Sequence, residues 1–184
     1  MTSPASVGGD DRLRLFLALQ LPANVLDVLE RWQAAHLGNG RMVGRDGLHV
    51  TLAFLGSRPS SELPAIVDAL RDAAAGSRRL VLAPRAWRET RSVGMLTFDD
   101  EDLRAAALAA DLHERLEALG VYEPERRTWL PHVTVLRFRR RPRLQPALPE
   151  LEPFVTSDAA AFLSRLRPDG ARYEVLESVA VGGR

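Results

Sequence analysis

The chain has 184 residues, of which 46% are hydrophobic and 27% charged, a size and balance typical of one compact domain with its own core. All 25 basic residues are arginine and there is no cysteine, which excludes chemistry that needs a lysine Schiff base, a P-loop lysine or a thiolate. The formal net charge is +1, so any attraction to nucleic acid must come from a local arginine cluster. The catalytic groups that remain are histidine, carboxylate, hydroxyl and arginine.

The beginning of the chain predicts a short tail and no targeting segment. Residues 1–11 are rich in serine, glycine and aspartate without periodicity, which predicts a mobile tail before a single domain at 12–184. The apolar run at 13–21 is too short for a signal peptide, and Pro22 ends it. No segment approaches the roughly 20 apolar residues of a membrane span. We therefore expect a soluble, cytoplasmic protein that does not bind membranes.

Strand-like and helix-like segments alternate through both halves of the chain. In chain order we expect a strand at 13–21, a helix around 25–33 that ends before Gly38, a strand at 48–55, a helix from Ser60 or Ser61 to near Gly76, strands at 79–88 and 93–98, a helix from Asp99 or Asp100 to Gly120, a strand at 130–136, an irregular stretch at 137–153, and strands at about 154–166 and 171–181. Periodicity alone fits two lobes with mainly antiparallel sheets and one parallel βαβ sheet equally well.

The tripeptide His-Val-Thr occurs twice, at 49–51 and 132–134, each time inside a β-rich run. Successive side chains of a strand point to opposite faces, so each histidine lies on the same face as the threonine two positions later. The same alternation predicts that Val50, Leu52 and Phe54, and likewise Val133 and Val135, face the opposite layer. Each half of the chain therefore offers an imidazole beside a hydroxyl.

Two such pairs across one cleft provide a general base, a general acid and two hydroxyl donors. This set suits in-line displacement at phosphorus, with protons moving onto and off oxygens around an anionic centre. No metal is required, because an imidazole with a pKa of about 6.5 can serve in either protonation state near neutral pH. A single half-buried histidine is more often structural, and a zinc site made from scattered histidines is a further alternative. His36 and His113 are expected to be surface or boundary residues.

Arginines follow the second tripeptide closely and could hold a phosphodiester backbone. Five of them fall within 137–143, and Arg126 and Arg127 precede the tripeptide. The alternative is a solvated loop whose charges pair with Glu150, Glu152 and nearby acids. Strict alternation places Arg137 on the face opposite His132 and Thr134, so it reaches their site only if the strand twists, bulges or ends. Several aromatic residues could stack on a base or belong to the core: Phe16, Trp32, Trp87, Trp129 and Tyr173.

The paired tripeptides and their flanking residues resemble the 2H phosphoesterases, in particular the RNA 2′,3′-cyclic phosphodiesterases, also called 2′-5′ RNA ligases. The resembling segments are 14–19 (RLFLAL), 48–56 (LHVTLAFLG), 131–137 (PHVTVLR) and 170–176 (GARYEVL). The resemblance implies an α+β fold with two pseudo-symmetric lobes, mainly antiparallel sheets around a central cleft, and helices outside. It implies no metal or nucleotide cofactor.

By match of motif, the resemblance makes His49 and His132 the catalytic residues, and Thr51, Thr134 and Arg137 substrate-binding residues. The implied reaction is hydrolysis of a terminal 2′,3′-cyclic phosphate of RNA to a 2′-phosphomonoester, with His49 as acid and His132 as base. Its reversal would join RNA ends through a 2′-5′ linkage without ATP. The alternatives are a non-catalytic nucleotide- or RNA-binding module, and a phosphodiesterase for a small cyclic nucleotide or a 2′-5′ oligonucleotide. The expected partner is an RNA or oligonucleotide with a cyclic phosphate end, bound by a monomer.

Overall fold

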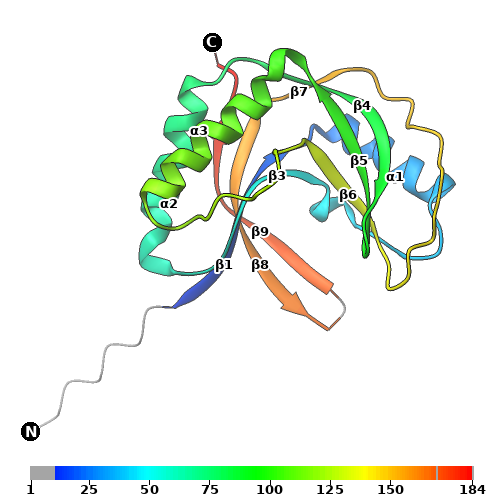
Figure 1. Cartoon of the computed structure of the whole chain (residues 1–184), viewed down its shortest axis with the longest axis horizontal. Helices are drawn as coiled ribbons and strands as arrows, with labels where there is room; N and C mark the ends of the chain where they lie inside the picture. Colours follow the sequence, from blue (N-terminus) through cyan, green and yellow to red (C-terminus); the bar gives the residue numbers. More distant parts are fainter. Residues whose placement is uncertain (1–10, 169, 184) are drawn as a thin grey trace, which may run out of the picture.

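A computed structural model describes residues 11–168 and 170–183, in which three helices flank one curled sheet (Figure 1). Apart from Asp11, the tail expected at 1–11 lies outside the described residues. The helices are α1 (Ala23–His36), α2 (Leu63–Gly76) and α3 (Arg104–Ala118). The strands are β1 (Arg12–Gln20), β2 (Arg41–Met42), β3 (His49–Pro59), β4 (Leu80–Glu89), β5 (Val93–Asp100), β6 (His132–Arg137), β7 (Phe154–Thr156), β8 (Asp158–Arg167) and β9 (Gly170–Ala180).

All strand pairings are antiparallel, which excludes the parallel βαβ arrangement. The order across the sheet is β7-β4-β5-β6-β3-β1-β8-β9, and β2 pairs with the outer end of β6. The β6–β3 junction, which joins the two halves of the sheet, consists of one paired position, Val50 with Val133. On either side of that position the two strands separate. The two halves therefore meet at the centre of the two His-Val-Thr tripeptides.

Two helices, α1 and α3, each contact the half of the sheet opposite to that of the strand that precedes them in the chain. Helix α1 follows β1, yet its Trp32 packs against Trp87 of β4 with ring centroids 6.1 Å apart. Helix α3 follows β5, yet it lies beside α2 and contacts β3 as well as β4 and β5 (Figure 1). Helices α1 and α3 therefore each contact a strand of the half of the sheet to which their preceding strand does not belong.

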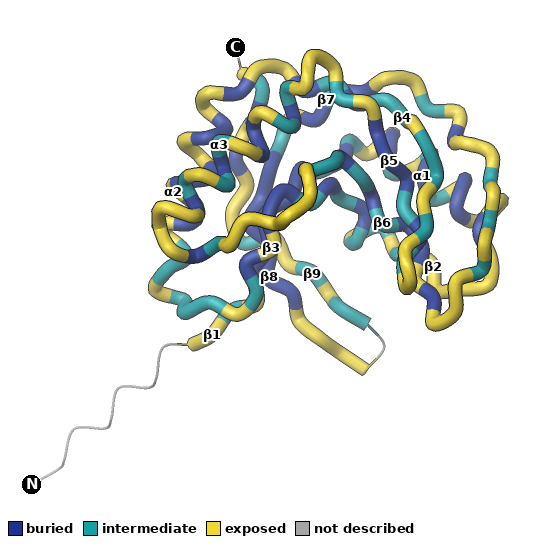
Figure 2. Tube along the Cα trace, viewed as in Figure 1, coloured by how far each residue is buried: buried dark blue, intermediate teal, exposed yellow. Residues whose placement is uncertain are grey.

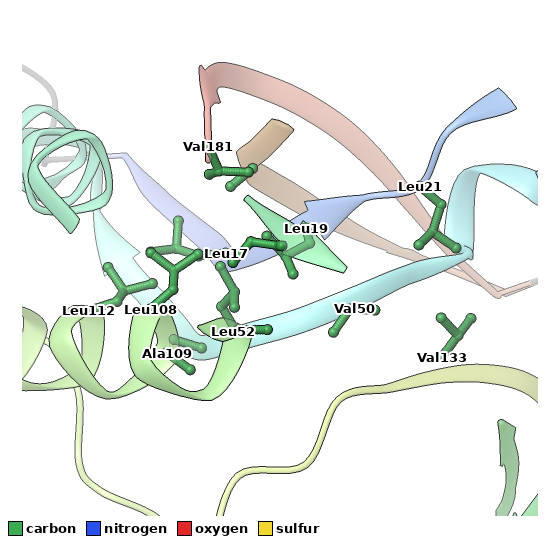
Figure 3. Close-up of a cluster of buried hydrophobic side chains, with 14 of the residues drawn as sticks. Leu17, Leu19, Leu21, Val50, Leu52, Leu108, Ala109, Leu112, Val133 and Val181 are labelled. Carbon is green, nitrogen blue, oxygen red and sulfur yellow. The ribbon is translucent and has the colours of Figure 1, made fainter. Parts of the chain in front are cut away.

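One core cluster extends through both halves of the sheet. Leu17 and Leu19 of β1, Leu52 of β3, and Leu108 and Leu112 of α3 are among its members (Figure 3). The tripeptide valines, Val50 and Val133, are fully buried in the same cluster. Burying a side chain of this size contributes about 1.5–3 kcal/mol. Figure 2 shows these buried positions along the inner strands, with exposed positions on the outer helices and loops.

The strands differ from the sequence prediction at two places. The single strand expected at 154–166 is two strands, because the chain changes partner at Ser157: β7 pairs with β4 and β8 pairs with β1. Both strands are apolar and extended, so periodicity shows no break between them. The short strand β2 was not expected, because it lies in segment 38–47, which is rich in glycine and arginine.

Helix α3 begins at Arg104, whereas the sequence predicted a start at Asp99 or Asp100. A 3₁₀ turn at Glu101–Leu103, with Asp102 and Leu103 at positive φ, lies between Asp100 and the helix. The carboxylate of Asp100 accepts hydrogen bonds from the backbone N–H groups of Ala105 at 2.9 Å and Ala106 at 2.8 Å. Such a contact satisfies N–H groups that have no partner inside the helix. Within residues 11–168 and 170–183, no helix is long and apolar enough to cross a membrane.

Candidate active site

A cleft of about 620 Å³ opens where β3 and β6 separate. All five residues predicted from the sequence line it: His49, Thr51, His132, Thr134 and Arg137. The two tripeptides, 83 residues apart in the chain, are neighbours in space because Val50 pairs with Val133. The structure therefore brings the whole predicted set into one site.

The antiparallel pairing arranges the tripeptides about an approximate two-fold axis. Since Val50 lies opposite Val133, the position of His49 lies across from Thr134, and that of Thr51 across from His132. The valines point into the core while the histidines and threonines point into the cleft. Each imidazole thus has one hydroxyl from its own strand and one from the facing strand.

A β-bulge at Leu52 changes which side chains of β3 face the cleft. Thr51 pairs with Ala18 and Ala53 pairs with Leu17, so Leu52 is the extra residue. Because Phe54 then pairs with Phe16, it lies on the same face as Thr51. The expectation that Phe54 faces the opposite layer was wrong: it is 47% exposed and lines the cleft.

A second bulge, at Val135, changes which side chains of β6 face the cleft. Thr134 pairs with Met95 and Leu136 pairs with Gly94, which leaves Val135 as the extra residue. Arg137 pairs with Val93, two positions from Met95 on β5, and therefore shares the face of Thr134. This bulge supplies the irregularity that Arg137 needs in order to reach the cleft.

The carbonyl group of each bulged residue accepts a hydrogen bond from a helix of the opposite half. His113 of α3 donates from Nε2 to Leu52 O at 2.7 Å, and Gln33 of α1 donates from Nε2 to Val135 O at 2.8 Å. The carbonyl of Val135 also accepts from the N–H of Val43 at 3.0 Å, and the Gln33 amide donates to Val43 O at 2.9 Å. The crossed helices thereby hold both irregular strand segments in place.

Replacing Gln33 with leucine is expected to destabilise the fold by about 1–3 kcal/mol. Leucine has a similar size but cannot donate the buried hydrogen bonds that the Gln33 amide makes to the carbonyls of Val43 and Val135. Urea unfolding measures the loss of unfolding free energy. Faster hydrogen exchange of the Val43 amide, which donates to Val135 O, would show that the loss arises at the bulge. The matched control is Arg31→Leu on the exposed side of the same helix. Unchanged unfolding and unchanged exchange in Gln33→Leu would show that the amide does not hold the bulge.

The imidazole of His49 lies in an aromatic box. It stacks on Phe16 and Phe162 with ring centroids 4.8 and 5.6 Å away, and the ring of Tyr173 meets it edge-on at 5.4 Å. Among the described residues, its buried Nδ1 has no hydrogen-bond partner. Burial, with smaller contributions from Arg137 and His132, lowers the pKa of His49 to about 4. In the free protein His49 is therefore neutral at pH 7.

His132 has a different environment. Its Nδ1 lies 2.8 Å from the backbone oxygen of Leu130, which can only accept a hydrogen bond. The proton is therefore on Nδ1, and neutral His132 has its lone pair on Nε2. The two imidazoles are chemically unequal although the strands that hold them are related by the approximate two-fold axis.

Other residues considered from the sequence have structural contacts. Phe16 and Tyr173 line the cleft but pack on His49, while Trp32 donates to Ala147 O at 2.7 Å and Trp129 donates to Thr51 O at 3.0 Å. His36 is exposed and His113 half-buried, as expected for surface and boundary positions, although the contact of His113 with Leu52 was not foreseen.

The arginines divide into those inside the cleft and those outside it. Arg14, Arg41, Arg45 and Arg172 line the cleft together with Arg137, and none of those four was singled out from the sequence. Alternation on β1 could have identified Arg14, which is two positions from Phe16; its guanidinium lies 4.7 Å from the ring centroid of Phe54. Arg45 is paired with Asp27 at 2.8 Å and Glu30 at 2.6 Å.

The described part of the chain contains no cluster of three or more histidine, aspartate or glutamate side chains arranged to hold a metal ion. The polar groups that line the cleft are instead imidazoles, hydroxyls and guanidinium groups, together with the carboxylate of Asp46. This set can transfer protons and bind an anion.

Solved structures of similar shape extend over nearly the whole chain. A crystal structure titled LigT of Escherichia coli complexed with 3′-AMP has a TM-score of 0.80 at 23% identity and covers 93% of this chain and 99% of that one. The structure titled TT0787 of Thermus thermophilus has a TM-score of 0.79 at 28% identity, with coverage of 93% and 99%. The mainly antiparallel α+β fold with helices outside, expected from the sequence, is confirmed.

Sequence comparison identifies the same group. A protein of Thermus thermophilus named RNA 2′,3′-cyclic phosphodiesterase is 31% identical over 187 residues, covering 93% of this chain and 91% of the relative. An Escherichia coli protein of the same name is 32% identical over 127 residues, covering 67% and 71%. The family model of the 2′-5′ RNA ligase superfamily matches residues 21–169. The chain therefore belongs to the 2′-5′ RNA ligase superfamily.

Proposed function

We propose that this protein hydrolyses the terminal 2′,3′-cyclic phosphate of RNA to a 2′-phosphomonoester, without a metal ion, using His49 and His132. The observation that carries the proposal is the pairing of Val50 with Val133, which presents two imidazoles and two hydroxyls to one cleft with Arg137 beside them. The names of the relatives from Thermus thermophilus and Escherichia coli support the same activity.

In the proposed reaction, His132 is the general base. Its Nδ1–H is held by Leu130 O, so Nε2 is free to accept a proton from water. The water oxygen attacks phosphorus, the bond from phosphorus to the 3′ oxygen breaks, and His49 gives its proton to that oxygen. Thr51 and Thr134 donate hydrogen bonds to the non-bridging oxygens, and Arg137 offsets their charge. The products are a 2′-phosphate and a 3′-hydroxyl, and solvent exchange restores both histidines.

His49 can act as the acid only if substrate raises its pKa from about 4. A phosphodiester monoanion about 4 Å away, at an effective dielectric constant of about 20, stabilises imidazolium by about 4 kcal/mol. That corresponds to about 3 pKa units, which raises the pKa of His49 to about 7 when substrate is bound. Binding of the anionic substrate and protonation of the acid are thus coupled.

The same site could run in reverse. If a 5′-hydroxyl replaces water as the nucleophile, its oxygen attacks phosphorus while the bond to the 3′ oxygen breaks, which forms a 2′-5′ linkage. The cyclic phosphate supplies the energy, so ATP is not consumed. We propose this ligation as a second activity of the same residues.

The test is turnover of an oligoribonucleotide with a 2′,3′-cyclic phosphate end in the presence of EDTA. We expect a 2′-phosphate product, identified against 2′- and 3′-phosphate standards, and a 2′-5′ joined product when a 5′-hydroxyl strand is in excess. Loss of activity in EDTA, restored by zinc, would contradict the metal-free mechanism. Tight nucleotide binding without turnover of an oligomer or a small cyclic nucleotide would favour a binding module instead.

A further inference from the structure

The segment directly after β6 presents arginines outside the cleft, and we refer to Arg139–Arg143 as the arginine turn. It begins two residues after Arg137 and is anchored by Phe138, which is buried and donates its N–H to Ser92 O at 2.9 Å. Strand β2 leads to the same place, because Arg41 pairs with Arg137. A second depression, lined by Asn39 and residues 140–143, adjoins this end of the two strands. In Figure 1 the bend after β6 lies at the same edge of the molecule as the β8–β9 hairpin.

A buried carboxylate fixes the shape of the arginine turn. The side chain of Glu89, 2% exposed, accepts from the backbone N–H groups of Arg143 at 3.0 Å and Leu144 at 2.7 Å, and from Nε of Arg141 at 3.0 Å. These hydrogen bonds hold the pKa of Glu89 below its usual value although burial acts against them. Arg143 has a φ of 58°, a conformation that non-glycine residues rarely adopt. The turn is thus held in one defined conformation.

The other arginines of the turn are left without acidic partners. Arg139, Arg140 and Arg143 are exposed, and no carboxylate of the described residues lies within ion-pair distance of them. Within the described residues Glu150 and Glu152 form no ion pair with the cluster. The alternative raised from the sequence, pairing with nearby acids, nevertheless holds for two arginines, because Glu89 pairs with Arg141 and Glu125 with Arg127. A fixed turn with three uncompensated positive charges attracts a polyanion with repeated negative groups.

We propose that the arginine turn binds the phosphodiester backbone of the RNA strand whose cyclic end lies in the cleft, so that the protein favours a polynucleotide over a mononucleotide. The inference rests on the proposed function, because the cleft supplies the fixed end from which the strand runs. The turn follows Arg137 along the chain, so a strand that leaves the cleft past Arg137 and Arg41 meets Arg140 and Arg139 next. Contacts to phosphate carry no sequence information, so the preference concerns strand length rather than base sequence.

The experiment compares KM for a 2′,3′-cyclic mononucleotide with KM for oligoribonucleotides of increasing length that end in the same cyclic nucleotide. We expect KM of the wild type to fall with length and then level off. The double variant Arg139→Gln/Arg140→Gln should raise KM for the oligomers toward the mononucleotide value and leave mononucleotide kinetics unchanged. The slope of log KM against log salt for the oligomer should decrease by about 1.4, or 0.7 for each phosphate that the variant no longer neutralises. The matched control is Arg78→Gln/Arg79→Gln, which removes two exposed charges immediately before β4.

In the kinetic experiment, the inference would be overturned by no length dependence in the wild type, or by an equal rise of KM for mononucleotide and oligomer in the double variant. Binding of a fluorescent oligomer with a 2′-phosphate end is measured in parallel, so that the turn is tested even if no substrate is turned over. Absence of turnover with all substrates would refute the proposed function, whereas equal binding by wild type and double variant would refute the inference. A poly-glutamate peptide that competes as well as RNA would also refute it.

Discussion

Replacement of His49 or His132 by alanine is expected to lower kcat for a 2′,3′-cyclic phosphate by about 10²–10⁴-fold, the usual contribution of a positioned proton-transfer group. KM should change much less, because Thr51, Thr134 and Arg137, the proposed phosphate-binding residues, remain in place. The double variant should not multiply the two losses, since residues that act as a unit are strongly non-additive. Single-turnover and steady-state assays of the three variants measure these effects.

The control for this prediction is His36→Ala, which removes an exposed imidazole at the end of α1 and should retain full activity. If His49→Ala and His132→Ala each kept near wild-type turnover, the two-histidine mechanism would be wrong. His49→Ala should also lower folding stability more than His132→Ala. The ring of His49 fills the aromatic box between Phe16, Phe162 and Tyr173, whereas the ring of His132 makes a hydrogen bond to Leu130 O.

Acidification is expected to destabilise the protein through His49 by roughly 3 kcal/mol between pH 6.5 and pH 4. The folded-state pKa of about 4 is below the unfolded value of 6.5, so within this window the unfolded chain binds a proton that the folded protein does not. The stabilisation is fully present above pH 6.5 and is lost as the pH falls through the folded pKa. Urea unfolding across this range measures it.

His49→Gln isolates this contribution, because a neutral amide in the aromatic box cannot titrate. The pH dependence of unfolding in the variant should be shallower than in the wild type by roughly the same 3 kcal/mol. His36→Gln, at an exposed position, should follow the wild-type curve. If the wild type and His49→Gln lost stability in parallel, the His49 pKa would not be depressed. Bound phosphate should raise that pKa, which imidazole proton resonances can report directly.

The residues predicted for the site could be selected from the sequence because their signal is local. Each His-Val-Thr tripeptide contains its own alternation, and the duplication marks both strands without knowledge of their partners. The contact of Asp100 with the first turn of α3 is also local, since its carboxylate is close in sequence to the N–H groups that it accepts from, although the helix itself begins at Arg104. Contacts within a few residues of one another leave a pattern that one sequence can show.

The features that were missed depend on contacts between distant segments. The bulges at Leu52 and Val135 exist because of the strand register and the donors on the crossed helices, and those donors lie 61 and 102 residues from the carbonyls that they meet. No periodicity in β3 could place Phe54 in the cleft. The change of partner at Ser157 is of the same kind, since both flanking strands are apolar and extended.

Among the described residues, one backbone position is paired between β3 and β6, so the strand ladder contributes little to holding the two halves of the sheet together. The shared core cluster and the hydrogen bonds from Gln33 and His113 to the bulged strands carry most of that connection. The spacing between His49 and His132 therefore depends on side-chain packing around the strands as well as on the strands themselves. Substitutions in the core, remote from the cleft, are expected to alter the geometry of the site.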